Sequence, residues 1–426
     1  MWQCPVGITC GASPRRPFDV SRSALSVVEP VAGLSGSGPE PQVEISVASR
    51  FHAFDLAREL AVHGMLRRLH TGYPSFIAAR FGVPRDAVSS IWTGEPLHRT
   101  LSSLHRRGWL GGQPDPFLSR RHDRIVASRL RPGADLFVGW SSQCHTSIAT
   151  ARRFGMTTIV ERGSAHIEWQ WRELTEEGRR TGLFVERPHP KTVEQEIAEY
   201  EAADFIAIPS AFAARTFVNC GVPAHKLLIN PYGVDLRLFD RRDDDRSVPI
   251  TKELRILHVG RVSAQKGAHY LVDAAGRLRN TRLTFVGAVD PGMHDVVRKS
   301  NVRVVGAVPG SVLPEYYRDS DVFCLLSIQD GLALVVAQAM AMGLPVIATP
   351  NTGAEELIDD GETGFIVPAR DPGAVASRLR ELAQNPELRK RIGQRARARV
   401  ASGFGWAHYG ARTRAHYHRV CNYKAR

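Results

Sequence analysis

The sequence predicts an α/β protein made of two doubly wound, parallel-sheet domains that face each other. Short apolar, β-branched segments alternate with helical segments along most of the chain, which is typical of parallel sheets. The alternation stops at a charged, proline-containing segment, DRRDDDRSVPITK at 240–252, and then begins again. Such a segment between two alternating series indicates a linker, so two domains with a cleft between them are expected.

Composition narrows the class of protein. A chain of 426 residues is too long for a single hydrophobic core of ordinary size, so more than one domain is expected. Contents of 43% hydrophobic and 23% charged residues are typical of a globular protein. No run of eighteen apolar residues occurs, so we expect no membrane-spanning segment. The six cysteines lack CxxC or CxxH spacing, which favours neither zinc nor a disulfide framework and indicates a reducing, cytoplasmic location.

The formal net charge of +13 allows three kinds of partner. Arginine pairs at 67–68, 106–107 and 120–121, with RKR at 389–391, could meet nucleic acid, anionic lipid or anionic small substrates. Any one pair is explained equally well as a solvated helix face. Aromatic residues do not interleave with the basic runs and no nucleic-acid module is recognisable, so nucleic acid is not an expected partner.

The first part of the chain predicts one βα unit with polar residues at its edge. Residues 1–42 are rich in Ser, Pro and Gly, and we expect a disordered extension before a first domain at 43–240. A strand at 43–49 is followed by RFHAFD and a helix through residue 63. His52 and Asp55 would lie at the carboxyl edge of the sheet, either facing a ligand cleft or serving as loop surface and helix N-cap. Residues 64–133 have a mostly helical pattern.

A second group of polar residues follows a buried strand at 157–160. The strands at 136–140 and 157–160 flank a helix at 146–154, and the later strand ends in Glu161-Arg162-Gly163-Ser164-Ala165-His166. Charged residues directly after a buried strand are costly unless they are used or paired, so this turn is a candidate site. For His166, a hydrogen-bonded ligand contact is favoured over a general base. A helix at 191–203, a strand at 205–209, a helix capped by Ser210 and a segment at 228–230 complete the domain.

The second domain, expected at 253–402, begins with a loop suited to a diphosphate. A strand at 255–259 leads into GRVSAQKG and a helix at 268–278. Gly260 allows close approach of a ligand, while Arg261, Lys266 and the helix N-terminus supply positive charge. The loop is neither GxGxxG nor a Walker loop, which argues against a dinucleotide oxidoreductase and an NTPase. Strands at 283–286 and 302–305 end at Gly287 and Gly306.

An apolar segment interrupted by two polar residues follows a strand at 322–326. Asp330-Gly331 is predicted to open and cap a helix over 332–342, which Gly343 ends before a strand at 344–348. On a helix, the eight positions from Asp330 to Gln338 would cover about 12 Å on one face. Two interpretations stay open at this point: a cradle for a long phosphorylated ligand, or a cap and a core glutamine. A last helix is expected at 404–420, in a C-terminal segment of residues 403–426. It is too isolated to belong to the second sheet.

These segments together resemble the retaining glycosyltransferases of family 4 (glycosyl transferases group 1), which have the GT-B fold. The resemblance rests on GRVSAQKG, SIQDGLALVVAQAMAMGLPVIAT and NTGAEELIDDGETGFIVP, in that order. It covers about residues 43–420 and is most specific between 228 and 368, where PYGVD at 231–235 resembles a family turn before the linker. It implies that the last helix, which begins at FGWAHY, crosses back onto the first domain.

The resemblance also implies roles for individual residues. Arg261 and Lys266 would bind the donor diphosphate, Asp330 the donor sugar and Gln338 the ribose, although the family has glutamate at both of the last two positions. The remaining implied donor contacts are Gly260, Gly287, Gly306, Gly331, Leu332 and Ala333. In the first domain, sugar or acceptor contacts are expected from His52, Glu161, Arg162 and His166. The residues expected to serve catalysis are Asp330, Arg261, Lys266 and His166.

The expected function is therefore transfer of a hexose from a nucleotide-diphosphate sugar to a hydroxyl acceptor, with retention of configuration. The acceptor would be a glycan or lipid-linked glycan in polysaccharide biosynthesis, and an anionic membrane surface is a further expected partner, at the inner face of the membrane. The nucleotide sugar is a substrate, and no metal or other cofactor is expected. Three alternatives are a nucleotide-sugar epimerase, a non-catalytic nucleotide-sugar binder of the same fold, and a nucleic-acid-binding protein, which rests on net charge alone.

Overall fold

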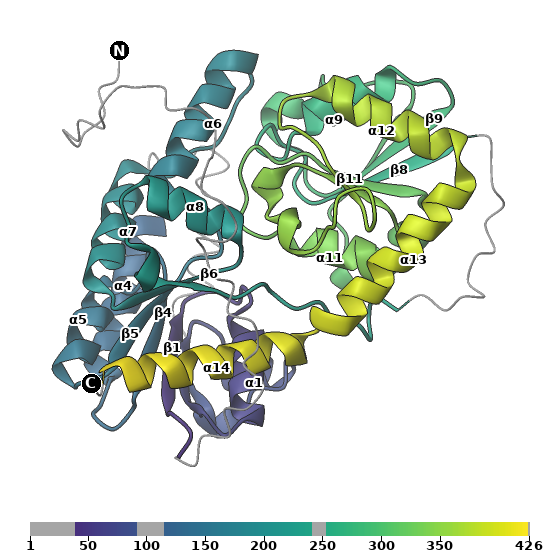
Figure 1. Cartoon of the computed structure of the whole chain (residues 1–426). Helices are drawn as coiled ribbons and strands as arrows, with labels where there is room; N and C mark the ends of the chain where they lie inside the picture. Colours follow the sequence, from purple (N-terminus) through teal and green to yellow (C-terminus); the bar gives the residue numbers. More distant parts are fainter. Residues whose placement is uncertain (1–38, 92–114, 241–252, 425–426) are drawn as a thin grey trace.

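The computed structural model describes residues 39–91, 115–240 and 253–424, and these form two α/β domains (Figure 1). The expected linker at 241–252 and nearly all of the expected N-terminal extension lie outside the described residues. In the described part of the chain, no helix is both long enough and apolar enough to cross a membrane.

The first domain is built on a seven-stranded parallel sheet in the order β3-β2-β1-β4-β5-β6-β7. Its strands are β1 (Val43–Val47), β2 (Leu66–Thr71), β3 (Val88–Ser90), β4 (Leu136–Trp140), β5 (Thr157–Glu161), β6 (Phe205–Ile208) and β7 (Leu227–Ile229). Its helices are α1 (Ala53–Val62), α2 (Ser75–Ala79), α4 (Asp115–Arg129), α5 (His145–Arg153), α6 (Ile167–Thr181), α7 (Pro190–Ala202) and α8 (Ala211–Asn219).

The second domain has a six-stranded parallel sheet in the order β10-β9-β8-β11-β12-β13. Its strands are β8 (Leu254–Val259), β9 (Thr281–Val286), β10 (Val302–Gly306), β11 (Val322–Leu325), β12 (Val346–Ala348) and β13 (Phe365–Ile366). Its helices are α9 (Ala268–Gly276), α10 (Leu313–Arg318), α11 (Leu334–Ala341), α12 (Pro372–Gln384) and α13 (Pro386–Gly403), and α14 (Trp406–Lys424) follows.

The predicted return of the last helix to the first domain is confirmed. Figure 1 shows α14, in yellow, crossing from the second domain to lie over α1. Gly410 makes this close packing possible, because a Cβ there would lie 2.8 Å from the Cβ of Glu59. Asn230 after β7 donates to Thr413 Oγ1 at 2.8 Å, so the helix is fixed to the sheet as well as to α1.

Both sheets reverse their strand order at one point, between β1 and β4 and between β8 and β11. In doubly wound sheets, ligands bind at the carboxyl ends of the strands at such a switch point. The segment containing His52 follows β1, and the turn at 141–144 follows β4. The loop at 260–267 follows β8, and the turn containing Asp330 follows β11. The fold therefore collects the segments singled out in the sequence at the two facing edges.

Two local expectations were wrong, and one helix was missed. Residues 66–71 and 88–90 are strands, because they pair alongside β1, although their arginines gave the region a helical pattern. The fifteen-residue helix α6 had no counterpart in the sequence interpretation. Asp330 does not cap α11, whose N-cap is Ala333 without a side-chain hydrogen bond. Because Asp330 precedes the helix, its distance from Gln338 is not set by helical rise.

Candidate functional site

The loop after β8 and the turn after β11 form one polar cluster. Lys266 Nζ forms an ion pair with a carboxylate oxygen of Asp330, and the same oxygen accepts from Ser327 Oγ at 3.4 Å. Gly267 holds the loop against the end of β11: its φ is +67°, and a Cβ there would lie 2.0 Å from the carbonyl oxygen of Leu326. Two residues 64 positions apart, expected to serve the same ligand, are thus in contact.

Glycines at the ends of β8 and β9 bring the backbone of the two strands close together. A Cβ on Gly287 would lie 1.9 Å from the carbonyl oxygen of Gly260, and both residues have positive φ. Gly306, at the end of β10, also has positive φ, +87°. These three glycines therefore stand at the same sheet edge as Lys266 and Asp330, as the donor-site prediction requires.

Arg261 is in contact with acids from both domains. Its guanidinium lies 2.6 Å from Glu186 of the first domain and 3.2 Å from Asp290 of the second. Arg261 and Glu186 are each about half exposed, so this pair is screened by water. The segment that carries Glu186 is anchored by Leu183 and Val185, which pack against the core of the second domain. Sequence reasoning missed Glu186, because nothing in its local pattern indicates an interdomain contact.

The backbone of 331–333 is less available than predicted. The Gly331 N–H donates to Asp330 Oδ1 at 3.1 Å, and the Ala333 N–H donates to the carbonyl oxygen of Thr352 at 3.1 Å. Leu332 and Ala333 are buried. Gln338 accepts from the Tyr317 hydroxyl at 3.0 Å, which occupies one of the two acceptor positions of its side-chain oxygen. Binding of phosphate by the N–H groups of Gly331 and Ala333 would have to exchange their present partners.

In the first domain, Glu161 and His52 form a buried pair at the carboxyl ends of β5 and β1. His52 Nε2 lies 2.9 Å from Glu161 Oε1, and both side chains are less than a tenth exposed. The His52 ring packs between Trp140 and Tyr232, with centroid distances of 4.9 and 4.1 Å. These two predicted contacts lie together, next to the turn of residues 162–166.

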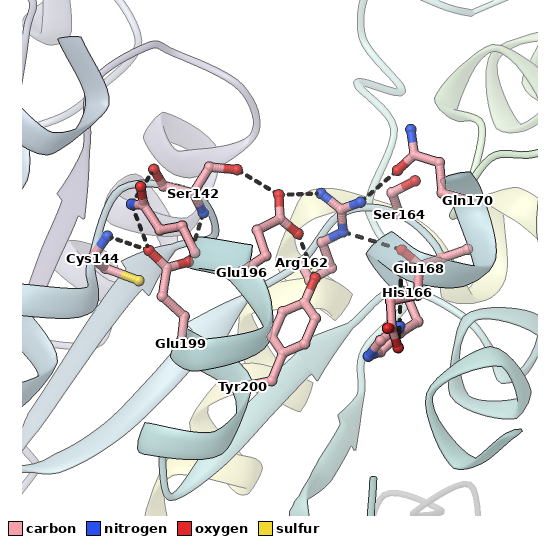
Figure 2. Close-up of polar contacts among 12 residues, drawn as sticks. Ser142, Cys144, Arg162, Ser164, His166, Glu168, Gln170, Glu196, Glu199 and Tyr200 are labelled. Atoms are coloured by element: carbon pink, nitrogen blue, oxygen red, sulfur yellow. Dashed lines mark hydrogen bonds and ion pairs between the residues drawn. The ribbon is translucent and has the colours of Figure 1, made fainter. Parts of the chain in front are cut away.

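Arg162 and His166 are engaged in the protein itself. Arg162 donates to Glu196 at 3.0 Å and to Gln170 at 2.6 Å (Figure 2). His166 Nδ1 accepts from the Glu168 N–H and caps α6, while its ring packs between Tyr200 and Phe217. Burial lowers the pKa of His166 to about 3, and nearby arginine charges add to this. The imidazole is therefore neutral at pH 7, and its assignment as a sugar contact or base stays a prediction.

Two buried glutamates of α7, which the sequence interpretation missed, support the turns after β4 and β5 (Figure 2). Glu196 binds Arg162 and the Ser142 and Tyr200 hydroxyls. Glu199 accepts from the N–H groups of Ser142 at 2.6 Å and Cys144 at 3.0 Å. Burial raises the pKa of Glu199 to about 8. Ser142 has a φ of +72°, an unfavourable conformation for a serine that these bonds hold in place. The sequence EQEIAEYE at 194–201 could have indicated them, because its spacing places Glu196 and Glu199 on one face of a helix.

The two domains meet through their candidate turns. Ser164 and Gly331 form an antiparallel bridge, and the Ala165 N–H donates to the Asp330 carbonyl oxygen at 3.2 Å. A Cβ on Gly331 would lie 2.2 Å from the Gly163 carbonyl oxygen, so only glycine fits there. Ser210 Oγ, at the N-terminus of α8, donates to the Gly331 carbonyl oxygen at 2.7 Å. The Asp330 turn is therefore held by the first domain as well as by Lys266.

Among the described residues, one group has the composition of a metal site. Ligand atoms of His166, Glu168 and Cys220 lie within 4.8 Å of one another. His166 Nδ1 is already the acceptor of the α6 cap.

Comparisons with known proteins agree with this geometry. Residues 253–385 match the family model described as glycosyl transferases group 1. A D-inositol 3-phosphate glycosyltransferase of Paenarthrobacter aurescens is 31% identical over 253 residues, which are 54% of this chain and 62% of that protein. The chain thus aligns with less than two thirds of this curated relative.

Two solved structures have the same overall fold. Sucrose-phosphate synthase from Thermosynechococcus elongatus superposes with a TM-score of 0.66 at 19% identity, over 90% of this chain and all of that one. HepE from Anabaena, solved in complex with UDP-glucose, superposes with a TM-score of 0.62 at 14% identity, again over 90% of this chain and all of that one. The fold and the motifs lead to one conclusion: the chain has the two-domain GT-B fold, and its residues 253–385 resemble the glycosyl transferases group 1 family.

Proposed function

We propose that this protein is a retaining glycosyltransferase that moves a hexose from a nucleoside diphosphate sugar to a hydroxyl acceptor. The observation that carries the proposal is the Lys266–Asp330 pair at the facing sheet edges, with Arg261 on the same loop. Two cations beside a helix N-terminus suit a diphosphate, and an adjacent carboxylate suits sugar hydroxyls. The UDP-glucose bound to HepE supports a nucleotide sugar as the first donor to test.

The chemistry assigned to these residues is electrostatic. Negative charge develops on the diphosphate as the bond to the sugar breaks, and fixed cations stabilise that charge. Lys266 is positioned by Asp330 before the donor arrives, while Arg261 must exchange Glu186 for phosphate oxygens. In same-face substitution the leaving phosphate takes the acceptor proton, so the proposal needs no general base and assigns none.

A thermal-shift panel of UDP-, GDP- and ADP-sugars tests the donor assignment. The wild type should be stabilised by at least one donor, because a ligand that binds only the folded state raises its stability. Arg261→Ala should lose most of that shift. Arg282→Ala is the matched control, since Arg282 is an exposed arginine at the opposite end of the same sheet. Stabilisation by none of the donors, or an equal shift in Arg261→Ala, would count against the assignment.

We further propose that the acceptor is a glycan or lipid-linked glycan and that the first domain docks on anionic lipid from the cytoplasmic side. Arg120 and Arg124 are exposed one turn apart on α4, which supports this orientation. Binding to phosphatidylglycerol vesicles in a flotation assay should fall in Arg120→Glu/Arg124→Glu and at high salt. Equal flotation with neutral phosphatidylcholine vesicles would remove the membrane part of the proposal.

A further inference from the structure

A buried hydroxyl without a partner lies at the junction of the two domains. Tyr232 follows β7, and its side chain is almost fully buried. In the described part of the chain, its hydroxyl has no hydrogen-bond partner. Buried tyrosine hydroxyls are ordinarily bonded, because removing one from water without compensation costs free energy. Such a group at a candidate site indicates that something other than the protein completes its bonding.

The hydroxyl lies next to the Asp330 turn. A Cβ on Gly163 would lie 2.9 Å from the Tyr232 hydroxyl oxygen, and a Cβ on Gly331 would lie 2.2 Å from the carbonyl oxygen of the same Gly163. Tyr232 and Gly331 therefore both lie next to Gly163. The bridge between Ser164 and Gly331 joins the domains at this point.

The neighbouring polar groups already satisfy each other. His52 stacks on the Tyr232 ring at 4.1 Å, but its Nε2 is bonded to Glu161. Arg162 is bonded to Glu196 and Gln170. Next to these bonded groups, the Tyr232 hydroxyl is a buried polar group without a partner among the described residues. Burial and the charge of Glu161 raise the pKa of Tyr232 well above its usual value, so it stays a neutral hydroxyl that can both donate and accept.

We propose that the Tyr232 hydroxyl hydrogen-bonds a hydroxyl of the transferred sugar and that Tyr232 is a specificity-determining residue for the donor. This inference rests on the proposed function. A sugar hydroxyl is both a donor and an acceptor, so it is a better partner for a neutral phenol than a phosphate oxygen, which only accepts. The phosphate oxygens are expected to bind Arg261 and Lys266 instead. The donor sugar is chosen over the acceptor because Tyr232 adjoins the turn expected to hold that sugar.

Tyr232→Phe removes only the oxygen and retains the ring that packs against His52. The ligand-free variant should unfold at the same temperature as the wild type or higher, because no protein hydrogen bond is lost. Tyr200→Phe is the matched control: its hydroxyl is equally buried but bonded to Glu196, so this variant should unfold at a lower temperature. A lower unfolding temperature for Tyr232→Phe would overturn the inference. The hydroxyl would then have a hydrogen-bond partner in the ligand-free protein, either a protein group or an ordered water.

Binding separates the sugar from the nucleotide. The affinities of UDP-glucose, GDP-mannose and ADP-glucose are each measured beside that of the free nucleoside diphosphate. Compared with the wild type, Tyr232→Phe should bind the sugar nucleotide about 3- to 10-fold more weakly and the diphosphate equally well. Equal affinity of both proteins for a sugar nucleotide that the wild type binds overturns the inference and leaves the proposed function standing. A wild type that binds no member of the panel overturns both.

Discussion

At the scale of single residues, the contact between Lys266 and Asp330 gives the sharpest expectation. Lys266→Ala removes a cation from the place where the diphosphate is expected to leave, so turnover should fall by about 100-fold or more. Donor hydrolysis in the absence of acceptor measures this. Lys299→Ala, which removes an exposed lysine of the same domain, should not change the rate. Unchanged hydrolysis by folded Lys266→Ala would mean that the cation serves the fold alone.

His166 offers a second test at this scale, because the structure gives it a definite local role. Asparagine is also a favourable N-cap, so His166→Asn should keep the α6 cap, whereas His166→Ala should lose about 1 kcal/mol more stability. If His166 is structural, turnover per folded molecule should be similar in both variants and close to that of the wild type. A large loss of turnover in His166→Asn, with the fold intact by circular dichroism, would favour the catalytic prediction instead.

The positions of the 260–267 loop and of the Asp330 turn could be predicted from sequence, and the contacts of the candidate residues in the first domain only in part. GRVSAQKG and the Asp330 turn are contiguous motifs, and their strand-end positions follow from the α/β pattern. Glu196 and Glu186 instead depend on how separate elements meet: Glu196 on α7 reaches Arg162 in the turn after β5, and Glu186 reaches Arg261 across the domains. No local sequence pattern predicts these two tertiary contacts.

At the scale of elements, the segment between α6 and α7 lies against the second domain. A Cβ on Gly292 would lie 3.1 Å from Phe184, and Arg370 binds Glu173 and Glu177 of α6. The arm formed by α6 and residues 182–186 therefore reaches the second domain at several points, and its Glu186 contacts Arg261. A donor diphosphate and Glu186 would compete for the same guanidinium.

We accordingly expect Glu186→Gln to bind a nucleoside diphosphate more tightly. An exposed ion pair contributes about 0.2–1 kcal/mol, which corresponds to an affinity gain of up to about 5-fold. Isothermal titration at low salt measures it, and the gain should shrink as salt is added. Glu173→Gln, which alters the same arm at Arg370, should leave the affinity unchanged. Weaker binding by Glu186→Gln would show that this carboxylate assists the donor.

Elements were predictable where their periodicity was clear and local. The strands at both switch points and the capping of α8 by Ser210 agree with the sequence. β2, with the sequence LRRLHT, was missed because its arginines hide the strand pattern, and its identity comes from pairing with β1. The start of α11 was misplaced because Asp330, a favourable cap by type, is bound to Lys266 instead.

At the scale of the whole molecule, buried histidines set the response to acid. Burial lowers the pKa of His122 and His166 to about 3 and that of His258 and His416 to about 4. These groups are neutral in the folded protein but take up protons near pH 6.5 when it unfolds. Their contribution to stability is therefore present above about pH 6.5 and is lost as the pH falls toward the folded pKa values.

Glu199 has the opposite effect on the pH dependence of stability over part of the same pH range. Its folded pKa of about 8 lies above the ordinary glutamate value of 4.5, so its contribution to stability grows as the pH falls from about 8 toward 4.5. The four histidines with lowered pKa values, against the carboxyls of Glu199, Asp55 and Asp290 with raised ones, leave a net change of at most about three protons. At about 1.4 kcal/mol per proton and pH unit, stability should fall by up to about 4 kcal/mol per pH unit between about pH 6 and pH 5.

Because domains are stable by only about 5–15 kcal/mol, this slope predicts that the folded protein is lost within a few pH units of neutrality. Thermal unfolding followed by circular dichroism at about pH 7, 6 and 5 measures the slope. His416 donates to the Ile229 carbonyl oxygen at 3.1 Å, and in His416→Gln an amide can replace that bond without titrating. This variant should lose stability less steeply with acid than the wild type. A stability that stays constant or rises from pH 7 to pH 5 would contradict the histidine account, and a slope unchanged in His416→Gln would assign the effect to the other three histidines.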